Sequence, residues 1–295
     1  MEEKNFSSKF ALPLSLLFAA LMVAAAWFFP AGSVQKSISS DLKSLEDRVL
    51  PTQGIELPVE WGDLGRKLVQ EGVIDSKKFE ALYAGRGRYG QTIQKLLLDT
   101  SNGRIVITPD NADLWLNLFW ALGLSNKSAI LEKGPMTDPR FGARGAGGFA
   151  STGGWTLSRG GAMEHYSRHA FLVLTPEEEA LVERVSRNIY RPCCNNPTYF
   201  PDCNHGMAML ALLELLAAHG AKEAEMYKIA LQVNAYWFPD TYLTVAKYLE
   251  SKGRSWESAD PKEILGENYS SASGYQLILS EVPPAQGTRG GGCGV

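Results

Sequence analysis

The sequence has 295 residues, with 29 basic and 32 acidic side chains and a formal net charge of -3. Hydrophobic residues make up 45% and charged residues 21%, which excludes both a disordered polyelectrolyte and a multi-span membrane protein. Nucleic acid is not expected as a partner, because no excess of basic side chains is present to neutralise phosphates. This length allows one large or two small domains with a buried core.

The first predicted element is an apolar segment at residues 10–31, which contains no charged side chain. About twenty apolar residues suffice to cross the hydrocarbon core of a bilayer. We therefore expect residues 1–9 to be a cytoplasmic flank and residues 10–31 to be a single-pass anchor in the cytoplasmic membrane. The bulk of the chain would then lie on the extracytoplasmic side. A cleaved signal peptide is the alternative, because the three alanines at 24–26 have the small size that a processing site requires.

The remainder of the chain is expected to fold as a stalk followed by a mainly α-helical, irregular multi-helix domain. Residues 32–60 form the stalk and linker, with helical spacing of apolar residues over 34–50 and a break at 51–58. The domain spans residues 61–280, and residues 281–295 form a flexible glycine-rich tail after a weakly patterned polar segment. The predicted helices cover residues 61–70, 75–83, 91–98, 114–124, 175–190, 206–218, 221–236 and 240–252. Residues 104–107 are the one convincing β-branched run, too short and isolated to define a sheet.

Two segments of the domain differ from ordinary amphipathic helices. Residues 114–124 are apolar on all sides, which is typical of a helix at the centre of a core. Residues 134–161 contain nine glycines with three interspersed arginines and little periodicity, which predicts a long loop. This loop is either a mobile cover or anion contact over a site, or a flexible connector. No Gly-Lys-Ser/Thr follows its glycines, so it is not a phosphate-binding loop and no nucleotide cofactor is expected.

A four-residue pattern occurs twice, as Tyr-Phe-Pro-Asp at 199–202 and Trp-Phe-Pro-Asp at 237–240, each ahead of a predicted helix. Proline ends the preceding helix and aspartate is a preferred N-cap, so we expect Asp202 and Asp240 to cap the helices that follow. The repetition indicates two helical hairpins of related design, although chance also produces so short a repeat.

The first of these corners carries an unusual concentration of metal-ligating side chains. Cys193, Cys194, Cys203 and His205 place three thiols and an imidazole within thirteen residues, and the second corner has no counterpart. With Asp202 as N-cap, Cys203 and His205 would lie in the first helical turn. The free backbone amides and the helix dipole at that position favour thiolate and neutral imidazole. Metal ions bind these deprotonated forms, so the cluster predicts a metal site.

The accompanying methionines indicate a soft metal. Met209 lies four residues after His205, on the same helical face, and Met207 is nearby. Thiolate, imidazole and thioether together favour Cu(I) first and Zn(II) second. The two adjacent cysteines face one ion only if the chain turns at this position, because neighbouring side chains of an extended strand point to opposite sides.

Three further residues are secondary candidates for metal ligands. Cys293 lies in the glycine-rich tail, which is flexible enough to fold back. His165 and His169 are four residues apart and would share one face of a helix over 162–170. Two solvated polar residues on a short helix are the alternative interpretation of this pair.

These features predict a membrane-anchored, extracytoplasmic protein that binds, delivers or senses Cu(I) or Zn(II). One alternative is a membrane-tethered thiol–disulfide oxidoreductase, the sole enzyme class that the sequence supports, since it lacks hydrolase, kinase and nicotinamide-dehydrogenase motifs. Another is a module that binds an envelope protein or polymer, with the cysteines forming a structural disulfide.

Overall fold

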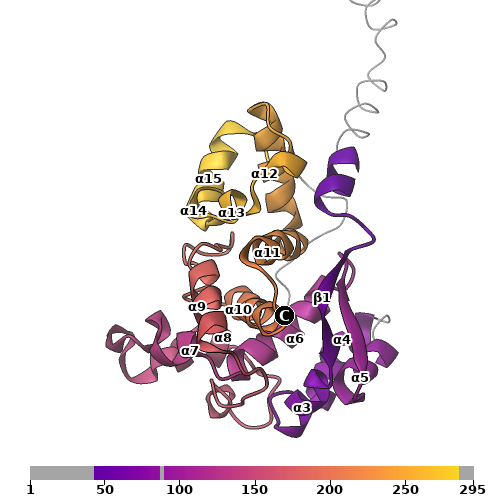
Figure 1. Cartoon of the computed structure of the whole chain (residues 1–295), viewed down its shortest axis with the longest axis vertical. Helices are drawn as coiled ribbons and strands as arrows, with labels where there is room; N and C mark the ends of the chain where they lie inside the picture. The colour runs from indigo at the N-terminus through magenta and orange to yellow at the C-terminus, as the bar shows by residue number, and fades with distance from the viewer. Residues whose placement is uncertain (1–42, 87–89, 286–295) are drawn as a thin grey trace, which may run out of the picture. The chain divides into compact units, whose positions relative to one another are not determined.

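The computed structural model describes residues 43–86 and 90–285 (Figure 1). The chain divides into two units, residues 1–47 and 48–295. In the first unit, residues 43–47 are helical, and the predicted flank, anchor and most of the predicted stalk lie outside the described residues. No helix in the described part of the chain is both long enough and apolar enough to cross a bilayer.

The second unit is mainly helical, as predicted, but it also contains a two-stranded antiparallel sheet. Strand β1 (Ile55–Gly62) pairs with β2 (Asn102–Ile107), with Ile55 opposite Ile107. This strand corrects two predicted boundaries: the break predicted at 51–58 ends at residue 54, and the helix predicted over 61–70 begins at Leu64. Leu57, Val59 and Trp61 are buried while the residues between them are exposed, the alternation of a half-buried strand.

Three short helices follow or flank this sheet. They are α3 (Leu64–Gln70), α4 (Ser76–Tyr83) and α5 (Gly90–Leu98), with the 3-10 turn η1 (Ala84–Arg86) after α4. Asp75 caps α4 as its sequence position suggests, because its carboxylate accepts hydrogen bonds from the backbone amides of Lys77 and Lys78 at 3.0 and 3.1 Å. The ring of Trp61 meets that of Trp115 edge to face, 5.4 Å between centroids, which joins the sheet to the core.

The core is centred on two apolar helices, α6 (Ala112–Ser125) and α10 (Asn204–Ala218). Nearly every residue of both is buried, which confirms the central position predicted for residues 114–124. The two backbones approach closely at Gly123, where an added Cβ would lie 2.2 Å from the carbonyl oxygen of Met207. Helix α10 ends at His219 and Gly220, whose φ of 79° is readily adopted by glycine.

The remaining helices pack around this pair. Helix α9 (Pro176–Ser186) starts with a capping box between Thr175 and Glu178 and lies against α10. Helices α11 (Glu223–Trp237) and α12 (Pro239–Ser251) meet at the second aromatic corner. The C-terminal segment, expected to be weakly structured, instead contains several helical pieces. These are η5 (Trp256–Ser258), α13 (Pro261–Ile264), α14 (Glu267–Ser270) and α15 (Ala272–Glu281).

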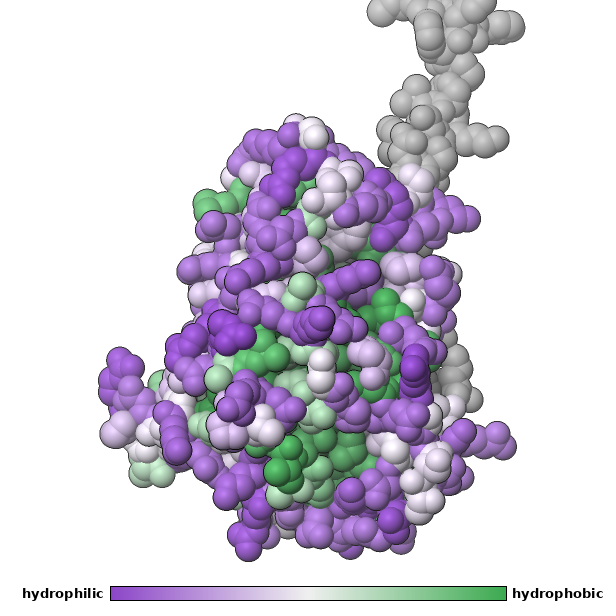
Figure 2. Space-filling view, in the orientation of Figure 1, coloured by the Kyte–Doolittle hydropathy of each residue, from purple (hydrophilic) through white to green (hydrophobic). Residues whose placement is uncertain are grey.

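The glycine-rich segment 134–161 lacks long regular elements, as predicted. It contains η2 (Pro135–Thr137), η3 (Pro139–Gly148) and α8 (Ala150–Gly153), with α7 (Ala129–Lys133) before it and η4 (Ala162–Glu164) after it. Phe141 and Phe149 of this segment pack on Phe200, with ring centroids 5.6 and 5.3 Å apart. The loop therefore lies against the first aromatic corner. On the face in Figure 2, polar side chains predominate and apolar ones show in patches between them.

Candidate metal centre

The first corner is a compact loop that connects the end of α9 to α10. The backbone amide of Cys194 donates to the carbonyl of Arg191 at 3.2 Å, so the chain turns at the adjacent cysteines. The loop is held to the start of α15 by hydrogen bonds from the amide of Ala272 to the carbonyl of Cys194, 2.9 Å, and from the amide of Ser273 to the side-chain oxygen of Asn195, 2.8 Å. The turn that both cysteines would require in order to face one ion is therefore present.

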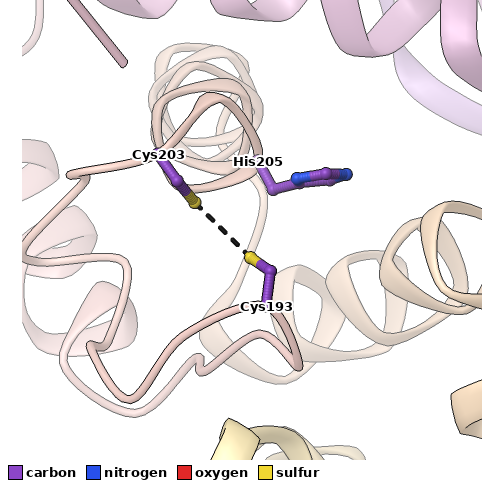
Figure 3. Close-up of side chains that lie close together, drawn as sticks. All are labelled: Cys193, Cys203 and His205. Atoms are coloured by element: carbon purple, nitrogen blue, oxygen red, sulfur yellow. Dashed lines mark hydrogen bonds between the residues drawn. The ribbon is translucent and has the colours of Figure 1, made fainter. Parts of the chain in front are cut away.

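The three clustered cysteines are free thiols that lie close together. The Sγ atoms of Cys193 and Cys203 are 3.6 Å apart and point toward one another (Figure 3). A disulfide requires about 2.05 Å, whereas two thiolates on one tetrahedral zinc ion lie about 3.8 Å apart, given Zn–S bonds of about 2.3 Å. The observed separation thus matches shared coordination of an ion. Cys193 is exposed, and Cys194 and Cys203 are partly exposed.

Cys203, rather than Asp202, is the N-cap of α10. Its Sγ accepts a hydrogen bond from the backbone amide of Gly206 at 3.4 Å. The prediction for Asp202 was wrong because its carboxylate is bound on both sides, by Arg191 at 2.6 Å and by the Asn196 amide at 2.7 Å. The thiol that was expected in the first helical turn is therefore at the cap itself, where the helix dipole favours thiolate.

Asp240 is likewise not an N-cap. Phe238 occupies the cap position of α12, Pro239 is the first helical residue, and Asp240 lies in the first turn. Proline is favoured at the first helical position, which moves the aspartate one residue into the helix. A carboxylate in the first turn still interacts favourably with the positive end of the helix dipole.

The buried side chain of Arg191 holds the corner together through hydrogen bonds. Its side chain is 1% exposed, and its guanidinium donates to Cys203 Sγ at 3.0 Å, to the carbonyls of Asn196 and Phe200 at 2.9 and 3.0 Å, and to Asp202 at 2.6 Å. Gly206 makes room for it, because an added Cβ there would lie 2.6 Å from the guanidinium carbon. Arg191 thus connects the loop at Asn196 and at Phe200 to the Cys203 thiol at the N-cap of α10.

These contacts lower the pKa of the Cys203 thiol and raise the pKa of the Cys193 and Cys194 thiols. Hydrogen bonds from the Cys193 and Cys194 thiols, followed by the charge of Arg191, hold the pKa of Cys203 well below its usual range. The hydrogen bonds of Cys193 with Cys194 and Cys203, together with burial, raise the pKa of Cys193. Cys203 is therefore the thiol of this cluster that loses its proton most readily.

His205 completes the cluster from the start of α10. Its ring is buried against Phe238 and Trp237, with centroids 4.4 and 5.8 Å away. A ring nitrogen and the sulfurs of Cys193 and Cys203 all lie within 4.8 Å of one another. Figure 3 shows the ring to one side of the line between the two sulfurs. The second aromatic corner therefore forms the wall against which the imidazole of the first corner rests.

A second group of potential ligands also includes Cys203. One ligand atom each from Cys194, Asp202 and Cys203 lies within 4.8 Å of the others. The guanidinium of Arg191 already contacts both Asp202 and Cys203 and so supplies the positive charge at this group. A metal ion consequently fits better at the group that contains Cys193 and His205.

The other predicted ligands are distributed differently. Met207 and Met209 are 0% and 1% exposed within α10, and their participation stays a prediction. Cys293 lies outside the described residues. The helix predicted over 162–170 was wrong, since only Ala162–Glu164 is helical, as a 3-10 turn.

His165 and His169 nevertheless meet. Nδ1 of His165 lies 3.2 Å from Nε2 of His169, and Nε2 of His165 lies 3.0 Å from the carbonyl oxygen of Arg159. Since a carbonyl only accepts, Nε2 of His165 carries the proton and its Nδ1 accepts from His169. One hydrogen bond thus joins the two rings, and Nδ1 of His169 lies 3.6 Å from a carboxylate oxygen of Glu71.

Comparisons with known proteins add no relative: no protein-family model, curated protein or solved structure matches the chain. The interpretation of the corner therefore rests on its own geometry. Arg191 and Asn196 were not predicted from the sequence. The available signals were an arginine two residues before the cysteine pair and, separately, a glycine (Gly206) at the start of an apolar helix.

Proposed function

We propose that this protein binds one soft or borderline transition-metal ion through Cys193, Cys194, Cys203 and His205. The observation that carries the proposal is the grouping of Cys193, Cys203 and the buried His205 at one helix start, with Cys194 in a second group that shares Cys203. Arg191 supports it as an outer partner, because its N–H group donates to the Cys203 sulfur and its charge offsets that of several thiolates. Such an arrangement orients the ligands before an ion arrives.

Within this proposal, Cu(I) is favoured and Zn(II) is the alternative. Thiolate is a soft ligand of the type that selects Cu(I), and the Cys193 and Cys203 sulfurs lie 3.6 Å apart. A tetrahedral Zn(II) site also needs the imidazole, whose nitrogen would lie about 3.5 Å from each sulfur, given Zn–S and Zn–N bonds of about 2.3 and 2.0 Å. The imidazole nitrogen and the two sulfurs lie within 4.8 Å of one another, so His205 needs at most a small adjustment to reach that distance.

The exposure of the site favours delivery or sensing over a purely structural role. Cys193 is exposed, so an incoming ligand reaches the ion from solvent without unfolding the corner. We place this site on the extracytoplasmic face of the cytoplasmic membrane, on the basis of the apolar segment 10–31. In whole cells, a membrane-impermeant thiol reagent should label Cys193 in a C293S variant, and protection until cell lysis would contradict this location.

Metal binding is tested with the full chain in detergent, under reducing conditions and without an affinity tag. Cu(I) and Zn(II) are titrated separately against a chromophoric chelator, and we expect one equivalent per chain. C193S and C203S should each weaken binding at least tenfold. C293S is the matched control and should bind as the wild type does. Substoichiometric binding of both ions, or binding that survives C193S and C203S unchanged, would overturn the proposal.

Thiol–disulfide exchange is a second candidate, favoured by the acidic Cys203 thiol beside the exposed Cys193. The Cys203 thiolate would attack a substrate disulfide and release one substrate thiolate. The Cys193 thiol would then lose its proton to solvent, attack the mixed disulfide and release the second thiolate, which leaves a Cys193–Cys203 bond. A small aromatic disulfide should thus yield two thiolates per reduced C293S chain and one in C193S/C194S/C293S. Unreactive reduced protein would exclude this activity.

A further inference from the structure

An acidic residue lies in the middle of the most apolar helix of the protein. Glu214 is 1% exposed, and the residues of α10 from His205 to Ala217 are all buried. Burial of a carboxylate is strongly unfavourable unless it is paired and hydrogen-bonded. Glu214 caps no helix and lies far along α10 from the cysteine corner. Neither the fold nor the proposed metal centre accounts for it.

The hydrogen bonds of Glu214 come from neutral groups. The side-chain amide of Asn126 donates to Oε2 at 2.9 Å, and Ser128 supplies a second hydrogen bond. The orientation of Asn126 is fixed, because its Oδ1 accepts the backbone amide of Leu172 at 2.9 Å. An ionised carboxylate has about four acceptor positions, so these two donors leave part of it open. No cation is among the described groups that influence this carboxyl.

Glu214 forms part of the wall of a surface cavity of about 210 Å³ between α9, α10 and the segment leading into α7. Its apolar lining comes from Ile130, Leu174, Ala180 and Val182. Its charged lining comes from Glu179, Glu183 and Lys127, in addition to Glu214. The cavity therefore combines an aliphatic wall with a buried carboxyl group, and acidic side chains outnumber the single lysine.

We propose that this cavity binds a small organic cation, a primary ammonium ion with a short aliphatic body, whose ammonium group lies against Glu214. The ammonium would supply the opposite charge that the buried carboxylate lacks and would donate to its open acceptor positions. The cavity of about 210 Å³ is large enough for a chain of a few carbons. This proposal is independent of the metal centre.

The acidity of Glu214 agrees with such a ligand. Burial, with a contribution from the nearby charge of Glu179, raises the pKa of Glu214 to about 7, against the hydrogen bonds from Ser128 and Asn126. Glu179 and Glu183 face it from α9, and Lys127 faces it from the segment before α7. The ionised form is therefore available near neutral pH, and a cation should bind more tightly at pH 8 than at pH 6.

The test uses the full chain and three probes of similar size: n-butylammonium, n-butanol and butyrate. Binding is followed at pH 8 by calorimetry and by NMR of the ligand. We expect n-butylammonium to bind at least tenfold more tightly than the other two. E214Q should abolish this preference, whereas E183Q, at the exposed rim, should change the affinity less than threefold. Equal binding of n-butanol, or full affinity in E214Q, would overturn the proposal.

A second variant tests the cavity without changing Glu214, so that a folding defect of E214Q does not decide the result. Ala180 is exposed on α9 and lines the cavity, so A180W should fill the space while leaving the core intact. Loss of n-butylammonium binding with an unchanged far-UV circular dichroism spectrum would support the cavity as the site. Retained binding in A180W would place the cation elsewhere and so refute the assignment.

Discussion

Replacement of Arg191 by lysine tests the structural basis of the cysteine corner. Lysine keeps the positive charge but has one compact ammonium group instead of a planar fork of five N–H donors. The arginine contacts four acceptors, namely Cys203 Sγ, the carbonyls of Asn196 and Phe200, and the carboxylate of Asp202. A lysine ammonium would reach the carboxylate or the sulfur, but each carbonyl would lose one of its two donors. The Phe200 carbonyl would keep the Asp202 amide at 2.9 Å, and the Asn196 carbonyl would keep the Cys194 thiol at 3.8 Å.

The magnitude follows from the burial of these groups. A buried acceptor that loses its donor destabilises a protein by about 1–3 kcal/mol, and removal of one partner of a buried ion pair by about 3–5 kcal/mol. Arg191 is 1% exposed, while Asp202 is 20% exposed and partly solvated. Because lysine retains part of the ion pair and each carbonyl keeps a second donor, we expect R191K to lower the free energy of unfolding by about 2 kcal/mol.

Urea unfolding, followed by tryptophan fluorescence, measures this free energy. The matched control is R184K, which alters an exposed ion pair with Glu223 at 2.9 Å and should lower stability by less than about 1 kcal/mol. Titration of the same samples with Cu(I) should show weaker binding in R191K alone. If R191K and R184K unfold at the same urea concentration, Arg191 does not hold the corner together and the reasoning fails.

Three further predictions concern the core, the pH dependence and the metal. The Cβ of G123A would meet the Met207 carbonyl at 2.2 Å, so this variant should lose about 2 kcal/mol in urea unfolding, whereas G103A, with open space around it, should lose far less. The pKa of Glu214 rises from 4.5 to about 7 on folding, so wild-type stability should fall by about 3 kcal/mol between pH 4.5 and 7 and then level off. E214Q should remove this slope in urea unfolding across that range, and a slope that persists would assign it to other groups. Finally, a chelator should lower the free energy of unfolding of metal-loaded protein, by about 2.7 kcal/mol if free metal was at 100 times its Kd, but should leave C203S unaffected.

The helical framework could be predicted because its signals are local. Residues 114–124 are apolar on every side, and such a helix has no stable position other than a core. Strand β1 shows how a local signal was overridden. The alternation that buries Leu57, Val59 and Trp61 is visible in the sequence, but Pro58 argued for a break. In a two-stranded sheet every strand has a free edge, so a proline at an exposed position is tolerated.

The cluster of cysteine and histidine residues at the first corner could be predicted from the sequence, but the position of the arginine that holds it could not. Spacing alone indicated that three thiols and an imidazole lie together, since a short loop limits how far they can separate. The position of Arg191 beneath the thiols depends on the close approach that Gly206 allows, which becomes apparent only in three dimensions. Glu214 is a similar case, because its neighbour Asn126 is 88 residues away in sequence.

The two aromatic corners, similar in sequence, have different tasks in the folded chain. Phe200 of the first corner packs on the glycine-rich segment, whereas Phe238 and Trp237 of the second form the wall behind His205. The indole N–H of Trp237 donates to the carbonyl of Ala112 at 3.1 Å, which fixes this wall to the central helix α6. Any adjustment of His205 toward the sulfurs would therefore move the imidazole along this aromatic surface. If the proposed metal centre binds an ion in this way, we expect its occupancy to change the environment of Trp237 and Phe238 at the junction of α11 and α12.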